Sequence, residues 1–310
     1  MAQAERTKIA TPPLTRRGGG AGLSDDTLKM LFLYPTLLLL IAFNVFPLLY
    51  SLYLSFTDYS AVANQPAKWV GLRNYEELLG SAQIWQYFRT TGFYVVASVA
   101  LETIVGFGLA LLLRKKFLAS GMLTTIILVP MMLSPVVVGL FWKLIYNPSY
   151  GIFNMLLGFP AGRGPDWLGN PQLALWAVVI VDVWMWAPYV MLLCLAGLSA
   201  IPEYLYEAAE IDRAGGFYTF WRVTLPMVAP LLLIAVLFRT IEAFRTFDLV
   251  MGLTGGGPGD ATELAAVNLY RLAFPQWQTG KASALAYIIL VIVTGVSNVY
   301  VKYLNQIKQG

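Results

Sequence analysis

The hydrophobic positions of this chain gather into long apolar runs that short polar segments separate. Six runs are long enough for a helix to cross a bilayer, which takes ~20 residues. They lie at 28–56, 90–113, 121–145, 173–198, 227–251 and 282–304. The pattern therefore predicts an all-α membrane protein with six transmembrane helices. Pro35 and Pro47 predict a tilt or a kink in the first of them.

Residues 1–27 precede the first run and differ from it in composition. Two prolines, a run of glycines and scattered charges predict a flexible cytoplasmic tail ahead of a membrane domain over 28–310. A cleavable signal peptide is not expected, because the first run begins late, is long and lacks a small-residue cleavage site.

Lysine and arginine are unevenly divided among the segments between the runs. With the N-terminus inside the cell, twelve fall in inner segments and six in outer ones, and Lys143, Arg239 and Arg245 lie within the runs. Because cytoplasmic loops are enriched in these residues, both termini are predicted to be cytoplasmic. The basic residues trace a membrane face rather than a patch that fits a groove, so no nucleic-acid partner is expected.

Composition narrows the class of protein further. Apolar residues make up 58% of the 310 residues and charged ones only 12%, too few to cover the surface of a soluble domain. The chain has no histidine, which removes the commonest metal ligand and histidine acid–base chemistry. The single cysteine, Cys194, lies in an apolar run and is expected to be a small packing residue.

The densest charge lies in the connector at 199–226, between the fourth and fifth runs. Glu203, Glu207 and Glu210 are spaced i, i+4 and i+7, so they share one face of a helix, and Asp212 follows them. The pattern indicates a docking surface for a partner, although a connector with a solvated acidic face would have the same pattern.

Small residues shape the rest of the connector. Ala208 and Ala209 have small side chains, so another chain can approach the helix backbone closely there. Gly215 and Gly216 are expected to end the helix in a left-handed turn. The segment "FYTFWRVTL" is then expected to form a second short helix that Pro226 stops before the fifth run.

The segment "EAAEIDRAGGFYTFWRVTLPMVAP" resembles the EAA loop of ATP-binding cassette importer permeases. Glu207-Ala208-Ala209 and Val223-Thr224-Leu225-Pro226 match the pattern of that loop in type and spacing, whereas Arg213 stands at the position of its glycine. The segments "VGLRNYEELL", "NPSYGIFN" and "LTGGGP" resemble the sugar-importer branch, and within it the first permease of maltose-type or glycerol-phosphate-type systems. The resemblance extends from about residue 28 to the C-terminus.

The resemblance implies the type I importer permease fold, with the connector as a coupling helix that docks on a dimeric cytoplasmic ATPase. It also implies a second homologous permease, an extracytoplasmic solute-binding protein and a sugar-like substrate, in the bacterial cytoplasmic membrane. ATP and Mg would bind to the ATPase and no cofactor to this chain, since "TGKASA" at 279–284 lacks two required residues of a phosphate loop. The residues expected to couple to the ATPase are Glu203, Glu207, Ala208, Ala209, Glu210, Asp212, Arg213, Gly215 and Gly216.

Two runs carry charged and aromatic side chains at helical spacing. Asp182, Met185, Trp186 and Tyr189 form one stripe, and Arg239, Glu242, Ala243 and Thr246 form another. A charge inside a bilayer costs roughly 2.5–3.5 kcal/mol on insertion scales, so it points to a function. Carboxylates bind sugar hydroxyls and aromatic faces stack on sugar rings, so the stripes predict a sugar pathway. The resemblance to the maltose-type permease places substrate contacts at Val136, Asp182, Met185, Trp186, Tyr189, Glu242, Ala243 and Thr246, and we add Arg239.

Structural alternatives remain open for these charges. Arg239–Glu242 and Arg245–Asp248 are both spaced for intrahelical ion pairs. Lys143 is expected to extend its charge to the interface, and Glu102 is expected to contact another helix or subunit. The two arginines leave an anionic sugar open as the substrate.

Two other classes of protein fit the residues less well. A secondary transporter would show an inverted repeat, which is not detectable, and would have no use for the connector. A membrane enzyme would need histidine or carboxylates at metal-ligand spacing. The sequence therefore predicts a transport subunit of an ATP-driven importer rather than an enzyme.

Overall fold

The computed structural model describes residues 24–63, 66–115, 117–160 and 162–309, where the regular elements are helices apart from one bridge between Thr57 and Trp69. The predicted tail therefore lies almost wholly outside the described residues. The chain divides into two compact units, Met1–Tyr50 and Ser51–Gly310. Five described helices are long and apolar enough to cross a membrane: Asp26–Ser55, Ala82–Leu113, Pro171–Ser199, Gly216–Phe244 and Thr279–Gln306.

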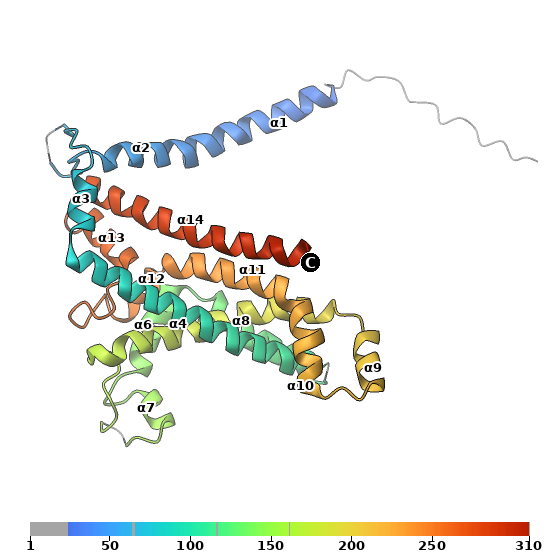
Figure 1. Cartoon of the computed structure of the whole chain (residues 1–310). Helices are drawn as coiled ribbons and strands as arrows, with labels where there is room; N and C mark the ends of the chain where they lie inside the picture. The colour runs from blue at the N-terminus through green and yellow to red at the C-terminus, as the bar shows by residue number, and fades with distance from the viewer. Residues whose placement is uncertain (1–23, 64–65, 116, 161, 310) are drawn as a thin grey trace, which may run out of the picture. The chain divides into compact units, whose positions relative to one another are not determined.

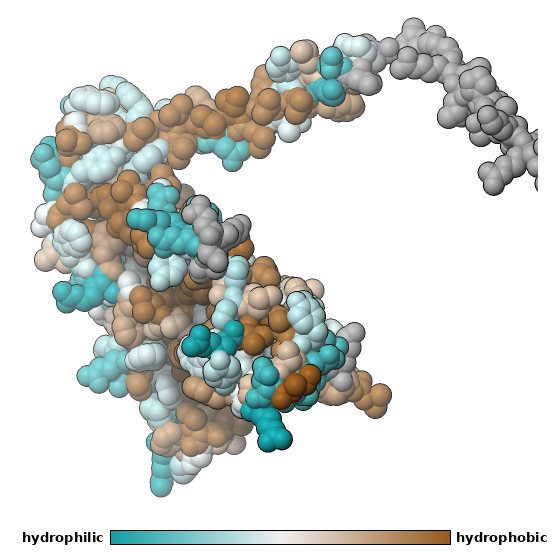
Figure 2. Space-filling model, turned by 45° about the vertical axis from the view of Figure 1, so that its right-hand side comes forward, coloured by the Kyte–Doolittle hydropathy of each residue, from teal (hydrophilic) through white to brown (hydrophobic). Residues whose placement is uncertain are grey.

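The first unit contains one apolar helical stretch. Helix α1 spans Asp25–Leu40, a π-helical turn follows at Ile41–Val45, and α2 spans Phe46–Ser55 across the boundary between the units. The π-helical turn ends two residues before Pro47, whose ring removes a backbone donor, so the expected irregularity is a local change of hydrogen bonding. Figure 2 shows the hydrophobic surface of this stretch, which is typical of a membrane-spanning helix.

The second unit is built on four long helices that run side by side in Figure 1. They are α4 (Ala82–Leu113), α8 (Pro171–Ser199), α11 (Leu225–Phe244) and α14 (Thr279–Gln309). Helix α8 packs against both α4 and α11, which also contact each other, and α8 is the most buried of the spans. Gly106 of α4 allows a close crossing, because a Cβ there would lie 2.5 Å from the carbonyl oxygen of Ala187. Small residues at such contacts let helix backbones approach in membranes.

The third apolar run is not a single helix, which corrects the prediction for 121–145. Helix α5 spans Ser120–Leu128, a 3₁₀ turn follows at Pro130–Met132, and α6 spans Pro135–Ile145. The two prolines that begin the later elements, Pro130 and Pro135, have no backbone N–H to continue a helix. Hydropathy alone does not register this break, because the residues around it are apolar.

The fifth run also differs from its prediction at both ends. Pro226 does not stop the preceding helix: α10 (Gly216–Thr219) continues through a π-helical turn (Phe220–Thr224) into α11. Proline is tolerated in this first turn of α11, where the widened π-helical turn precedes it. At the other end, α11 stops at Phe244 and a new helix, α12, spans Asp248–Leu253.

Helices α6 and α12 cross with their backbones in contact. A Cβ on Gly139 would lie 2.9 Å from the carbonyl oxygen of Leu249, and one on Gly252 would lie 2.7 Å from that of Val136. This crossing brings the start of α6 beside the break that follows α11.

The two ends of the bundle carry different elements (Figure 1). At one end lie α3 (Arg73–Leu79), α7 (Ile152–Leu156) and α13 (Ala265–Ala273). At the other lie α9 (Tyr204–Ile211), α10 and the C-terminal end of α14. The charged connector and the end of the chain therefore share one end of the bundle.

Candidate functional site

A buried ionic network joins three helices in the interior of the bundle. Arg239 of α11 donates through Nε to Glu102 Oε2 at 2.6 Å and through Nη2 to Glu102 Oε1 at 2.8 Å. The same Nη2 donates to Asp182 Oδ2 of α8 at 3.1 Å. These side chains are at most 4% exposed. Charges are tolerated at this depth because each has a hydrogen-bonded partner of opposite sign.

This network settles the pairing of the intramembrane charges. Arg239 bonds across to other helices rather than to Glu242 on its own helix. Glu242 instead accepts from Arg245 Nη1 at 3.2 Å. Neither of the two intrahelical pairs that the sequence left open, Arg239–Glu242 and Arg245–Asp248, is therefore among the ion pairs of the described residues. The expected contact of Glu102 with another helix is confirmed, and its partner is Arg239.

A polar cavity of about 110 Å³ opens beside this network. Helices α8 and α11, the start of α6 and the segment around α12 form its walls. Five predicted substrate residues line it: Asp182, Trp186, Arg239, Glu242 and Thr246. The guanidinium carbon of Arg239 lies 4.8 Å from the ring centroid of Trp186, which holds the indole against the charged network.

The other predicted substrate residues do not line this cavity. Met185 and Ala243 are buried in the hydrophobic core between the helices. Tyr189 packs against a second core cluster, and Val136 is one residue beyond Pro135, which does line the cavity. Sequence reasoning missed Pro135, Phe247, Asp248 and Leu249, which reach the cavity only because both apolar runs break there.

Both arginines that line the cavity are paired with carboxylates. Arg239 is neutralised by Glu102 and Asp182, while Arg245 pairs with Glu242 near the surface, where their side chains are 67% and 56% exposed. Typical small-molecule sites hold about 300–1,000 Å³, several times this volume. The cavity that this chain forms by itself is therefore smaller than a typical small-molecule site.

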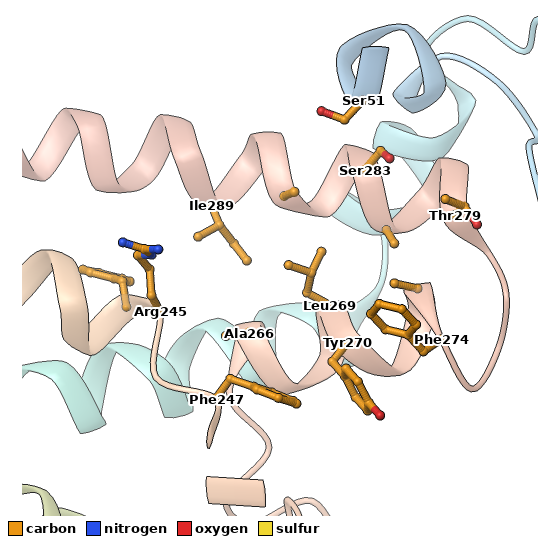
Figure 3. Close-up of a pocket in the computed structure, with 14 residues that line it drawn as sticks. Ser51, Arg245, Phe247, Ala266, Leu269, Tyr270, Phe274, Thr279, Ser283 and Ile289 are labelled. Carbon is orange, nitrogen blue, oxygen red and sulfur yellow. The ribbon is translucent and has the colours of Figure 1, made fainter. Parts of the chain in front are cut away.

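A larger cavity of about 570 Å³ lies between α13, α14 and the segment after α11 (Figure 3). Its lining is mainly apolar, and Arg245 is the charged residue that lines it. Arg245 and Phe247 also line the polar cavity, so the two hollows are neighbours. A hydroxyl-rich ligand would lose hydrogen bonds to water in such an apolar space, so the smaller cavity suits it better.

Beyond the C-terminal end of α8, helix α9 presents the predicted acidic face to solvent. Glu203, Glu207 and Glu210 are exposed, and none of them takes part in an ion pair of the described residues. The inner face is fixed by Tyr206, whose hydroxyl lies 3.1 Å from Thr224 Oγ1 and whose ring lies 3.9 Å from the guanidinium carbon of Arg114. Helix α9 is therefore attached to the ends of α4 and α11 while its carboxylates stay free to bind.

The turn after α9 corrects the expectation for the two glycines. The residue in the left-handed region is Arg213, at φ 54°, and not Gly215 or Gly216. The amide of Ala214 bonds to the carbonyl of Ala209 at 2.8 Å and that of Arg213 to the carbonyl of Glu210 at 3.0 Å, which is the Schellman arrangement of a helix end. Gly215 is extended, at φ −64° and ψ 152°, and Gly216 begins α10.

Comparison with known proteins gives consistent matches. The family described as "binding-protein-dependent transport system inner membrane component" matches residues 102–306. The trehalose/maltose transport system permease protein MalF of Thermococcus litoralis is 39% identical over 282 residues, 90% of this chain and 94% of that protein. The sulfoquinovosyl glycerol transport system permease protein SmoG of Agrobacterium fabrum is 32% identical over 283 residues, covering 91% and 92%.

A solved structure shares the fold. A bacterial ABC transporter involved in the import of the acidic polysaccharide alginate has a chain that aligns with a TM-score of 0.79 at 21% identity. The alignment covers 91% of this chain and 96% of the other.

Proposed function

The chain belongs to the family of binding-protein-dependent transport system inner membrane components, and we propose that it is one of two permease subunits of a carbohydrate importer. It is a multi-pass membrane transport subunit and not an enzyme, and the ATPase that drives transport is a separate chain. Relatives named for trehalose, maltose and sulfoquinovosyl glycerol support a carbohydrate substrate.

Six membrane crossings fit the described helices. Five are the long apolar helices, and the sixth is α5, the 3₁₀ turn and α6 taken together. With six crossings the chain begins and ends on one side. The distribution of lysine and arginine assigns that side to the cytoplasm of a bacterial inner membrane. Helix α9 then lies on the cytoplasmic side with the C-terminus (Figure 1).

The partners follow from this orientation. The exposed carboxylates of α9, with Ala208 and Ala209 beside them, fit a groove of a dimeric cytoplasmic ATPase that binds ATP and Mg. A homologous second permease would enlarge the polar cavity to the size of a sugar site, since the cavity of this chain alone is small. An extracytoplasmic solute-binding protein would deliver the sugar to the opposite end of the bundle.

The single observation that carries the substrate proposal is the cavity beside Asp182 and Trp186. It combines carboxylate acceptors for sugar hydroxyls with an indole that can stack on a sugar ring. Within it Asp182, Trp186, Glu242 and Thr246 would contact the sugar, and Arg239 would hold Asp182 in place. Val136, Met185, Tyr189 and Ala243 would support the wall from behind or beside it.

Transport in proteoliposomes tests this function. The complex of both permeases, the ATPase and the binding protein should take up a radiolabelled disaccharide only with ATP. Trp186→Ala should lower uptake several-fold to over a hundredfold, since losing ligand contacts typically costs about 1–3 kcal/mol.

A matched control is Trp176→Ala, because Trp176 lies on the same helix, packs edge-on against Phe93 and does not line the cavity. Equal uptake by both variants would contradict the site. Failure of wild type to transport any of a broad panel of sugars would contradict the carbohydrate substrate.

A further inference from the structure

Glu102 lies behind the polar cavity and not on its wall. Its side chain is fully buried, and it uses both carboxylate oxygens to hold one edge of the Arg239 guanidinium. We propose that Glu102 determines the charge class of the substrate: by neutralising Arg239 it makes the site accept uncharged sugars and reject acidic ones. This inference rests on the proposed carbohydrate function of the cavity.

The geometry shows which of the two carboxylates binds Arg239 more strongly. Glu102 receives two hydrogen bonds, at 2.6 and 2.8 Å, whereas Asp182 receives one, at 3.1 Å. A bidentate pair of this kind is stronger than a single bond and constrains both side chains. Asp182 lines the cavity and Glu102 does not, so an incoming ligand meets Asp182 first and cannot reach Glu102.

The balance of charge around the cavity is negative. Asp182, Glu242 and Asp248 line it against Arg239 and Arg245, and Glu102 adds another carboxylate directly behind Arg239. Both arginines are already paired with carboxylates. An acidic sugar would therefore bring its own anion beside Asp182 without a free cation to bind it, and like charges at such distances repel strongly in a poorly solvated site. Hydroxyl groups of an uncharged sugar can donate to the same oxygens without this penalty.

Substitution of Glu102 should change this selectivity without touching the cavity wall. In Glu102→Gln the side chain keeps its size and one acceptor oxygen, but the cluster of Glu102, Asp182 and Arg239 changes from two carboxylates against one guanidinium to one against one, so Asp182 is the remaining anionic partner of Arg239. The guanidinium can then bind a carboxylate of the sugar through its fork geometry. Removing the arginine as well, in Glu102→Gln with Arg239→Gln, should restore the rejection of acidic sugars, because the cation that accepted them is gone.

Equilibrium binding to the purified permease–ATPase complex, without the binding protein, measures this directly. The probes are radiolabelled cellobiose and its uronic acid, cellobiouronic acid. Wild type should bind cellobiose at least about tenfold more tightly than the uronic acid, and Glu102→Gln should improve binding of the uronic acid by about tenfold. Glu77→Gln, at the outer end of the bundle and outside this cavity, should leave the ratio unchanged.

Each outcome of this binding experiment supports or contradicts the proposed role of Glu102. Equal binding of both probes by wild type, or an unchanged preference in Glu102→Gln that still binds cellobiose, would overturn the role of Glu102. If Glu102→Gln does not assemble, the test is the ratio of the wild-type affinities for cellobiose and for the uronic acid. A site without the proposed charge balance would not exclude the uronic acid, so a ratio near one would contradict the proposal. Loss of all sugar binding by wild type, for these and for other disaccharides, would instead overturn the proposed carbohydrate function.

Discussion

Arg239 and Glu102 form a two-point contact in the interior of the bundle, with Nε 2.6 Å and Nη2 2.8 Å from the two carboxylate oxygens. The contact joins α11 to α4, while the bond to Asp182 adds α8. Removing one partner of such a buried pair leaves an uncompensated charge and costs about 3–5 kcal/mol, whereas replacing both by apolar residues is often close to neutral. The pair therefore has a distinctive signature in mutants.

Single and double substitutions of this pair should be strongly non-additive. We expect Arg239→Met to destabilise the complex by about 3–5 kcal/mol, because it leaves both Glu102 and Asp182 without their partner. The double variant with Glu102→Leu should be more stable than Arg239→Met alone, because only Asp182 is then left unpaired. Thermal unfolding of the purified complex, followed by tryptophan fluorescence, measures the three variants. Additive losses would show that the two side chains do not compensate each other in the membrane.

A glycine at position 213 should stabilise the connector. Arg213 occupies the left-handed region at φ 54°, which costs a residue with a Cβ about 1–2 kcal/mol relative to glycine. Arg213→Gly should therefore raise the melting temperature of the complex. Arg213→Ala is the matched control, because it removes the same side chain but keeps the strained backbone. Equal effects of the two variants would assign any change to the lost charge rather than to the turn.

The connector shows what the sequence can and cannot predict locally. The spacing of Glu203, Glu207 and Glu210 correctly predicts an exposed acidic helix face. The prediction that Gly215 and Gly216 form the left-handed turn was wrong. The Schellman hydrogen bonds require the left-handed residue directly after the last helical residues, and that position holds Arg213. Arg213 is held there by the bonds on either side of it. The EAA loop that this segment resembles has a glycine at the position of Arg213. That correspondence was the signal in the sequence that position 213 is the left-handed one.

Acid should weaken the contact between α3 and the start of α14. Lys281 Nζ lies 2.7 Å from Glu77 Oε2 and Arg73 Nε lies 2.9 Å from Oε1, and these bonds, the one from Lys281 first, lower the pKa of Glu77 below its ordinary 4.5. Because the pKa is lower in the folded protein, the stabilisation is fully present above about pH 4.5 and is lost as the pH falls through the folded value. The difference in melting temperature between wild type and Glu77→Gln should thus shrink on acidification below pH 4.5, and a constant difference would contradict this role.

The orientation predicts which introduced thiols react from outside the cell. Cys194 is buried, so its replacement by alanine should give a silent background. In that background Arg163→Cys, in the segment before α8, should react with a membrane-impermeant maleimide on intact cells, and Tyr218→Cys in α10 should react only after lysis. The opposite result for the two positions would reverse the proposed topology.

The long spans were predictable from hydropathy, and the broken ones were not. Runs at 90–113, 173–198 and 282–304 each fall within one helix of the described chain, because an apolar stretch without an internal break satisfies its backbone as a helix. The runs at 121–145 and 227–251 break near Pro130 and Arg245, where packing of α6 on α12 stabilises the short pieces. The cavity lies at these breaks, so its walls could be predicted only where they belong to regular helices. The main partner of Arg239, Glu102, is far away in sequence, and helical spacing could therefore offer only Glu242 as an alternative.

The acidic face of α9 offers the most direct test of coupling to the ATPase. Glu207 is exposed on a helix whose other side is fixed by Tyr206 to Thr224 and Arg114, so its substitution should leave folding and insertion intact. Glu207→Lys places a cation where the partner groove is proposed to bind an anion, and such like-charge contacts cost several kcal/mol at an interface. We expect a variant that reaches the membrane and pairs with the second permease but loses the ATPase.

Co-purification of the ATPase and substrate-stimulated ATP hydrolysis in membranes measure this loss. Glu76→Lys is the matched control, because Glu76 is also an exposed glutamate, on α3 at the opposite end of the bundle, away from the proposed ATPase surface (Figure 1). It should leave both measurements close to wild type. If Glu207→Lys also retains the ATPase and its coupled hydrolysis, the carboxylates of α9 form a solvated surface and the coupling must pass through another part of the chain, such as the exposed aromatic residues Phe217 and Tyr218 of α10.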